Sequence, residues 1–177
     1  MSEFESVGVD IKWQGRMLTV GVERFRRRDD GEIVREKVWH PGAVAMLAID
    51  DQHVWLTRQP REAVGESSSL EVPAGKLDVE GESPARGAAR ELSEEVGKRA
   101  GSWEELMWFY TSPGFSDERI YLYLATDLTD DPDGHPDEGE SIQVVPWPRD
   151  RLNAAIAQCH DSKSLIALLW LQANPDR

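Results

Sequence analysis

The sequence predicts an α/β fold in which a small antiparallel β region, residues 1–40, precedes a main domain, residues 41–177. Three observations lead to this prediction: alternating apolar residues near the N-terminus, continuous apolar runs further on, and one helix with marked ends. With 177 residues, 40% of them apolar, the chain is long enough for one domain with a small appendage and can form its own core.

The N-terminal region has the period of two that is typical of strands. Apolar side chains occupy alternate positions from Val7 to Trp13 and again from Leu18 to Val22. A turn at Asp29 to Gly31 leads into a third candidate strand, Ile33 to Trp39. This pattern predicts a three-stranded meander.

The main domain begins with two apolar runs, Gly42 to Ile49 and Val54 to Thr57, that suit strands buried on both faces. Beyond the helix described next, the expected elements are a strand over 106–110, a loop over 112–119, a strand over 120–125, an acidic loop over 127–140, a strand over 142–147, and helices over 149–158 and 162–173, with Ser162 as a candidate cap.

The helix expected over Pro84 to Val96 has both ends marked. Ser83 is a preferred N-cap residue, Pro84 suits the first helical position, and Gly97 suits the left-handed residue that ends a helix. The rotation of about 100° per residue predicts one apolar stripe on the core side. That stripe consists of Ala85, Ala88, Ala89, Leu92 and Val96.

Three glutamates, Glu91, Glu94 and Glu95, share another face of this helix at the spacing i, i+3, i+4. Like charges at this spacing destabilise a helix by about 0.2–0.5 kcal/mol per pair, so a compensating charge is expected. A divalent cation such as Mg²⁺ would supply it, because hard cations take oxygen ligands and assist phosphoryl chemistry. The alternative is a solvated acidic face in which Arg90 is the partner charge.

Charge and cysteine content narrow the classes of function. Thirty-three Asp and Glu against 20 Lys and Arg give a net charge of −13, which disfavours a nucleic-acid partner. Cys159 is the single cysteine, so no disulfide forms within one chain. The N-terminus lacks a signal-peptide pattern, and no run approaches about 18 apolar residues. We therefore expect a soluble, cytoplasmic protein with no membrane partner.

The segment from Gly75 to Lys98 resembles the Nudix box, G-x5-E-x7-R-E-U-x-E-E-x-G-U, where U is a bulky apolar residue. The matching residues are Gly75, Glu82, Arg90, Glu91, Leu92, Glu94, Glu95 and Gly97. The segment departs from the pattern twice, because six residues rather than five separate Gly75 from Glu82, and Lys98 stands at an apolar position. The resemblance implies the Nudix fold, an α/β/α sandwich with a mixed sheet.

Over most of its length, the chain resembles the ADP-ribose pyrophosphatase branch of the Nudix hydrolases. The supporting segments are 40–47, 57–65, 70–78, 112–125 and 161–171, and Pro113 occupies a position at which that branch carries proline. The resemblance implies Mg²⁺-dependent hydrolysis of ADP-ribose to AMP and ribose 5-phosphate, with Mn²⁺ as an alternative metal. It also implies a homodimer in which the N-terminal strands contribute to dimerisation.

The resemblance also implies roles for individual residues. The implied metal ligands are the main-chain carbonyl of Ala74 and the carboxylates of Glu91, Glu94 and Glu95, with Glu82 holding the loop or joining the outer metal shell. Arg90 would orient a glutamate through a charge-assisted hydrogen bond. The general base is expected in the late acidic loop, at Glu140 or alternatively at Glu138, although such loops are often only solvated.

Substrate contacts are implied at three places. Arg61 resembles the arginine that grips the diphosphate, the alternative being a surface arginine. The loop containing Gly114, Phe115 and Glu118 resembles the one that recognises the terminal ribose, or it is a tight hairpin in which Phe115 packs. The adenine contacts implied are Arg35 and Trp39, of which Trp39 could equally belong to the core.

Two other functions stay open at this point. One is the same hydrolysis applied to another nucleoside diphosphate sugar, such as a GDP- or UDP-hexose. The other is an ADP-ribose-binding sensor that has lost hydrolysis, although this chain keeps Glu91, Glu94 and Glu95.

Overall fold

The computed structural model describes residues 4–28, 31–135 and 141–177, which divide into two compact units. Unit 1 consists of Met1–Gly42 with Phe109–Arg119, and unit 2 consists of Ala43–Trp108 with Ile120–Arg177. The expected division into domains at residue 40 stays a prediction.

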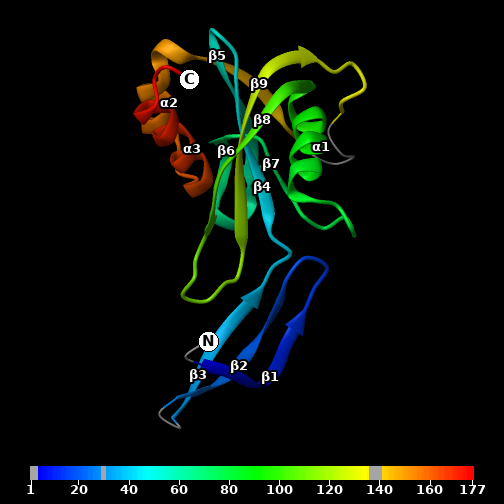
Figure 1. The fold of residues 1–177 in the computed structure, drawn as a ribbon, viewed down its shortest axis with the longest axis vertical. Coiled ribbons are helices and arrows are strands. Elements are labelled where there is room, and N and C mark those ends of the chain that lie inside the picture. The colour runs from blue at the N-terminus through cyan, green and yellow to red at the C-terminus, as the bar shows by residue number, and fades with distance from the viewer. Residues whose placement is uncertain (1–3, 29–30, 136–140) are drawn as a thin grey trace. The chain divides into compact units, whose positions relative to one another are not determined.

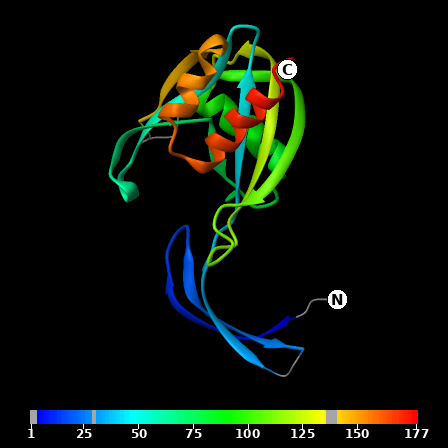
Figure 2. The same ribbon diagram turned by 90° about the vertical axis from the view of Figure 1, so that its left-hand side faces the viewer.

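Unit 1 contains a three-stranded antiparallel sheet in the order β1-β2-β3. Its strands are β1 (Phe4–Gln14), β2 (Thr19–Arg27) and β3 (Glu32–Trp39), and Figure 2 shows how strongly they twist. The meander expected from the period of two is therefore confirmed.

A loop that precedes β9 completes unit 1. The backbone N–H of Val38 on β3 donates to the carbonyl of Phe115 at 2.8 Å, and the N–H of Asp117 donates to the carbonyl of Val38 at 3.3 Å. Lys37 adds an ion pair with Asp117 at 3.5 Å, and the side chain of Asp117 also accepts a bond from the N–H of His40. The loop is thus fastened to β3 by both backbone and side chains.

Unit 2 is organised around a mixed sheet in the order β10-β5-β4-β9-β8, to which β6 adds beside β5 and β7 adds beside β4. β4 and β9 are parallel, whereas β4 is antiparallel to β5 and β7. The strands are β4 (Ala43–Ile49), β5 (His53–Arg61), β6 (Glu66–Glu71), β7 (Ala74–Lys76), β8 (Lys98–Tyr110), β9 (Arg119–Asp130) and β10 (Gln143–Pro148).

Helices cover both faces of this sheet, as Figure 1 shows. Helix α1 (Pro84–Val96) lies on one face, and helices α2 (Leu152–Gln158) and α3 (Ser162–Ala173) lie on the other. Short 3₁₀ turns, η1 (Glu62–Val64) and η2 (Arg149–Arg151), follow β5 and precede α2. This is the expected α/β/α sandwich. Within the described ranges, none of the helices has the length and apolar character needed to cross a membrane.

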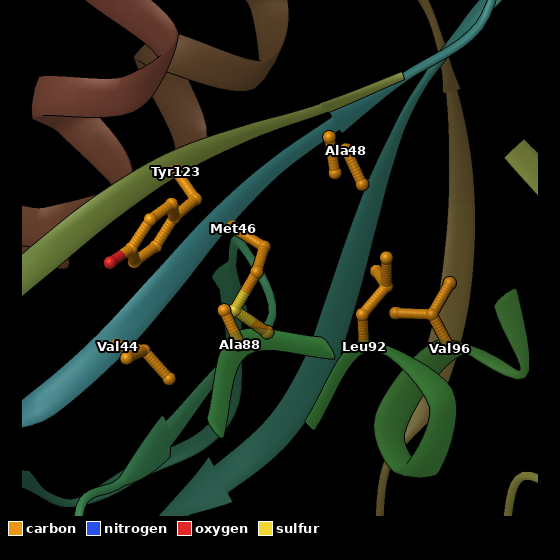
Figure 3. Close-up of a cluster of buried hydrophobic side chains, with 8 residues drawn as sticks. Val44, Met46, Ala48, Ala88, Leu92, Val96 and Tyr123 are labelled. Carbon is orange, nitrogen blue, oxygen red and sulfur yellow. The ribbon is translucent and has the colours of Figure 1, made fainter. Parts of the chain in front are cut away.

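The core between the sheet and α1 fixes the position of that helix. Val44, Met46 and Ala48 of β4 point toward Ala88, Leu92 and Val96 of α1, and Tyr123 of β9 joins the cluster (Figure 3). All these side chains are buried, and each fully buried aliphatic side chain contributes roughly 1.5–3 kcal/mol. Because every second side chain of β4 points toward α1, these residues determine which face of that helix is buried.

Four expectations about the elements need correction. β6 and β7 were not expected, since their sequences lack an apolar alternation. β8 begins at Lys98 rather than at 106, and β9 continues to Asp130, into the segment expected to be a loop. Asp161 rather than Ser162 caps α3, because its side chain accepts from the N–H of Ser164 at 3.0 Å.

The expected apolar stripe of α1 is only partly correct. Ala88, Leu92 and Val96 are buried, but Ala85 and Ala89 are exposed.

Candidate active site

Helix α1 begins and ends where its sequence indicates. Ser83 is extended and its carbonyl accepts the first intrahelical bonds from the N–H groups of Arg86 and Gly87, although its hydroxyl makes no capping bond. Gly97 has a φ of 66°, a left-handed conformation that glycine adopts without strain, and its N–H donates to the carbonyl of Ser93 at 2.9 Å. These ends fix which residues face the sheet.

Arg90 gathers three carboxylates into what we call the α1 acidic cluster: Glu82, Arg90, Glu91 and Glu94. Its guanidinium bonds to both oxygens of Glu82 at 3.2 Å, to Glu94 at 2.7 Å, and lies 2.8 Å from Glu91. Burial alone would lower the pKa of Arg90, but the bond to Glu82 and the charges of Glu91 and Glu94 raise it. One cation serves three anions, so the cluster retains an excess of negative charge.

The three glutamates of α1 differ in burial, because Glu95 is buried whereas Glu91 and Glu94 are partly exposed. The alternative of a solvated acidic face therefore does not hold for Glu95. Glu95 is 5% exposed, and one carboxylate oxygen accepts the N–H of Ala74 at 2.9 Å. The bond ties the C-terminal half of α1 to the start of β7. Glu95 and the main chain at Ala74, both predicted as metal ligands, are therefore neighbours.

Gly75 provides the space that Glu91 occupies. A Cβ on residue 75 would lie 1.8 Å from the carboxyl carbon of Glu91, far inside any real contact. The glutamate carboxylate thus rests directly on the backbone of β7, one residue from Ala74. The requirement for glycine at this point of the box has a steric cause.

The donor atoms near Ala74 are of the type that binds a hard divalent cation. Glu91, Glu95 and the Ala74 carbonyl offer only oxygen, the ligand type that Mg²⁺ prefers, and water commonly completes its shell. Within the described ranges, no group of three or more Asp, Glu, His or Cys side chains is arranged so that it could hold a metal ion by itself. The protein therefore presents donor groups on a supported backbone rather than a complete cage.

Lys98, which departs from the box pattern, still behaves as a packing residue. Its ammonium lies 4.1 Å from the ring centre of Trp55 and pairs with Asp130 at 2.6 Å. The aliphatic stem of a lysine can cover an aromatic ring while the charge reaches an acid. The substitution leaves the α1 acidic cluster untouched.

Arg61 is held by a second charged group, which we call the Arg61 cluster: Arg61, Glu71 and Lys163. Nε and Nη2 of Arg61 each donate to Glu71 at 2.7 Å, and Nζ of Lys163 donates to the same carboxylate at 2.6 Å. Glu71 is 2% exposed. Burial would raise the pKa of Glu71, but the bonds from Arg61 and the charge and bond of Lys163 outweigh it and lower the pKa to about 2.

Neither Glu71 nor Lys163 was predicted from the sequence as a site residue. The available signal for Glu71 is its place between Leu70 and Val72, two apolar residues, at the end of a strand. A charged residue inside such a buried run needs a partner, and two cations supply it here.

The remaining predicted contact residues lie in unit 1. Arg35 is exposed, and Trp39 is half-buried with its ring against Gly21. Phe115 is 55% exposed, which disfavours the alternative that it packs in a hairpin. Glu118 accepts the hydroxyl of Thr111 at 2.7 Å and so braces the loop.

A hollow of about 400 Å³ within unit 1 contains several of these residues. Arg35, Gly114 and Phe115 line it together with Phe25 and Ile33. The two candidate bases, Glu138 and Glu140, lie outside the described residues.

The fold and the acidic helix define the class of this protein. Residues 39–167 match the NUDIX domain family, and the chain belongs to that family. The family and the fold predicted from the box are thereby confirmed.

The chain is also similar to individual proteins over most of its length. An ADP-ribose pyrophosphatase of Mycobacterium tuberculosis is 40% identical over 141 residues, which are 78% of this chain and 68% of that protein. A methanol dehydrogenase activator of Bacillus methanolicus is 36% identical over 174 residues, 96% of this chain and 93% of that protein. A crystal structure described as an ADP compounds hydrolase is 25% identical, with a TM-score of 0.82 over 98% of this chain and 97% of that one.

Proposed function

We propose that this chain hydrolyses the diphosphate bond of ADP-ribose to AMP and ribose 5-phosphate with Mg²⁺ as its metal. The observation that carries the proposal is the arrangement at the start of β7, where Glu95 bonds to Ala74 and Glu91 rests on Gly75. Oxygen donors at this place suit a hard cation. The similarity to an ADP-ribose pyrophosphatase supports the choice of substrate.

The proposed reaction moves one water molecule across the diphosphate. Water attacks one phosphorus, the bond from that phosphorus to the bridging oxygen breaks, and the bridging oxygen leaves on the other phosphate. When bound, a divalent cation supplies neutralisation of charge on the phosphate oxygens. Glu91 and Glu95, with the Ala74 carbonyl, are the proposed ligands, and Glu94 and Glu82 are proposed to act from the outer part of the site.

Further roles are proposed from the resemblance, and local geometry supports the role of Arg90. Arg90 orients Glu94 and Glu82 through the bonds described above. The base that takes the proton from water is proposed at Glu140, with Glu138 as the alternative. Arg61 is proposed to grip the diphosphate, for which a planar guanidinium is suited.

In unit 1, Arg35 and Trp39 are proposed for adenine, and Gly114, Phe115 and Glu118 for the terminal ribose. The exposure of Phe115 and the bracing of Glu118 by Thr111 support these assignments.

We further propose a homodimer formed through the N-terminal strands. β1 exposes Val9 and Ile11, which alternate along the strand and share one face, and it also exposes Trp13 beyond a break in the strand register. Sedimentation of the full chain tests this, since a monomer at micromolar concentration contradicts it. A cytoplasmic location is also proposed, and Cys159, buried with no disulfide partner, is compatible with a reducing compartment.

The decisive experiment measures AMP release from ADP-ribose with and without Mg²⁺, beside GDP-mannose and UDP-glucose. A Glu95→Gln variant should lose about 100-fold or more in kcat, because a metal ligand and the bond to Ala74 are weakened together. Glu80→Gln, at an exposed loop residue, is the matched control and should keep its rate.

The outcomes separate the rival functions. Fastest turnover of ADP-ribose, lost in Glu95→Gln, supports the proposal. Faster turnover of another sugar nucleotide keeps the chemistry and rejects the substrate. Binding of ADP-ribose without AMP release would favour a sensor.

A further inference from the structure

The Arg61 guanidinium is held along one edge only. A guanidinium has five N–H donors, and the side-on contact with Glu71 uses one on Nε and one on Nη2. In the part of the chain that the structure describes, no acceptor bonds to Nη1. Arg61 is 41% exposed at its side chain, whereas Glu71 is buried. The edge formed by Nη1 and the second hydrogen of Nη2 is therefore open to a ligand.

Glu71 itself is fixed from the opposite side. Lys163 donates to the carboxylate oxygen that also accepts Nη2 of Arg61. The next residue, Val72, donates its N–H to the hydroxyl of Ser164 at 2.8 Å, so the end of β6 is joined to the first turn of α3. Asp161 caps that turn and contacts Lys163 at 2.9 Å. The carboxylate cannot turn without disturbing both elements.

Arg61 and Glu71 line a hollow of about 550 Å³ in unit 2, large enough for a diphosphate. The same hollow is lined by Glu62, Glu66 and Asp161, so it has no general attraction for anions. Affinity for a phosphate there has to come from directed donors. An arginine whose orientation is already fixed provides them without losing further side-chain freedom on binding.

We propose that Glu71 is a positioning residue: it holds one edge of the Arg61 guanidinium so that the other edge donates end-on to the diphosphate of the substrate. The proposal rests on the role of Arg61 in the proposed function. It adds a buried carboxylate, supported by Lys163, that contacts no substrate itself.

A double-mutant cycle tests this dependence on Arg61. The variants are Glu71→Gln, Arg61→Ala and their combination, and the two readouts are kcat and KM for ADP-ribose and the Kd of inorganic pyrophosphate, by calorimetry in metal-free buffer. Glu71→Gln should raise KM and Kd about 10-fold and change kcat by less than about 3-fold. In the Arg61→Ala background, the same substitution should change neither constant by more than about 2-fold.

Glu80→Gln is the matched control. It makes the same substitution at an exposed loop residue outside the Arg61 cluster, so the Kd of pyrophosphate should stay within about 2-fold of the wild type. If Glu71→Gln does not fold, Glu71→Gln combined with Lys163→Met removes one charge of each sign and takes its place. Circular dichroism of each variant verifies folding.

The results either support or overturn the proposal. A Glu71→Gln effect that persists without Arg61, an equal effect of Glu80→Gln, or no pyrophosphate binding by the wild type overturns it. Absence of ADP-ribose turnover together with pyrophosphate binding that follows the expected cycle rejects the proposed substrate and keeps the role of Glu71.

Discussion

The α1 acidic cluster and the Arg61 cluster both contain an arginine paired with glutamate, but carboxylates outnumber cations in the first and cations outnumber carboxylates in the second. Around α1, Arg90 faces three half-buried carboxylates, whereas in the second cluster Arg61 and Lys163 share the single carboxylate of Glu71. The first arrangement keeps an excess of negative charge near the surface, which attracts a cation. The second satisfies a buried anion completely, which fixes the direction of an arginine.

Burial explains why the proportions differ. A carboxylate removed from water needs close cations and hydrogen bonds, or it becomes uncharged. Glu71 has three bonds from two cations, and its pKa falls to about 2. The glutamates around Arg90 keep some contact with water and share one guanidinium. The same residue types are thus proposed to bind a cation in one place and to orient an arginine in the other.

Of the substitutions that test this comparison, Gly75→Ala, which breaks the support of the first cluster, has the largest expected effect. The added methyl group would displace the Glu91 carboxylate, because it would lie 1.8 Å from its carboxyl carbon. We expect kcat to fall about 10-fold to 100-fold and more Mg²⁺ to be needed for half-maximal rate, as when a ligand is misplaced. Steady-state kinetics across a Mg²⁺ titration measures both.

Gly101→Ala is the control for that substitution. Its Cβ would meet Asp127 at 3.1 Å, a contact that a small shift relieves, and the residue lies on β8. Unchanged kinetics in Gly75→Ala would contradict the role given to Glu91.

The contrast between the clusters predicts that the loss of a cation lowers the free energy of unfolding by different amounts in the two places. Lys163→Met should lower the free energy of unfolding by about 2–3 kcal/mol, because a buried charge loses a partner. Arg90→Met should cost only about 1 kcal/mol, since its partners remain partly solvated. Added Mg²⁺ should recover stability in Arg90→Met but not in Lys163→Met.

Urea titrations with and without Mg²⁺ give these free energies. Equal losses for the two variants, or equal recovery with Mg²⁺, would remove the distinction between the clusters.

The smallest effect is a change in acid stability. Since the folded-state pKa of Glu71, about 2, lies below its usual 4.5, its contribution to stability is present above pH 4.5 and is lost as the pH falls toward 2. In Glu71→Gln combined with Lys163→Met this part of the loss should be missing, so unfolding free energy should decline less steeply over that window. A decline identical to that of the wild type would show that Glu71 titrates normally.

The sequence could predict helix α1 to the residue because proline, glycine and an apolar period all mark it. It could not predict β6, whose residues Glu66–Glu71 are mostly polar and form a strand because β5 offers them hydrogen-bonding partners. The early part of β8 was missed for the same reason. Strand pairing is a tertiary event that leaves little trace in a single strand.

The candidate site likewise contains some residues that the sequence predicts and some contacts that depend on the fold. Glu91, Glu94, Glu95 and Arg90 are neighbours on one helix, so their spacing alone brought them together. The burial of Glu95 and its bond to Ala74 depend on β7, and Lys163 reaches Glu71 from 92 residues away in sequence. Contacts of that range require the fold itself.

The central strand β4 also bears on how firmly the site is held against local opening. All seven of its residues are buried, and it pairs with β5, β7 and β9. Amide hydrogens in such a strand exchange with deuterium only when the whole domain opens. Ala74 pairs with Ala45 of this strand, so the carbonyl proposed as a metal ligand shares the slowest-opening part of the molecule. Denaturant that frays the sheet edges should therefore leave metal affinity unchanged until global unfolding begins.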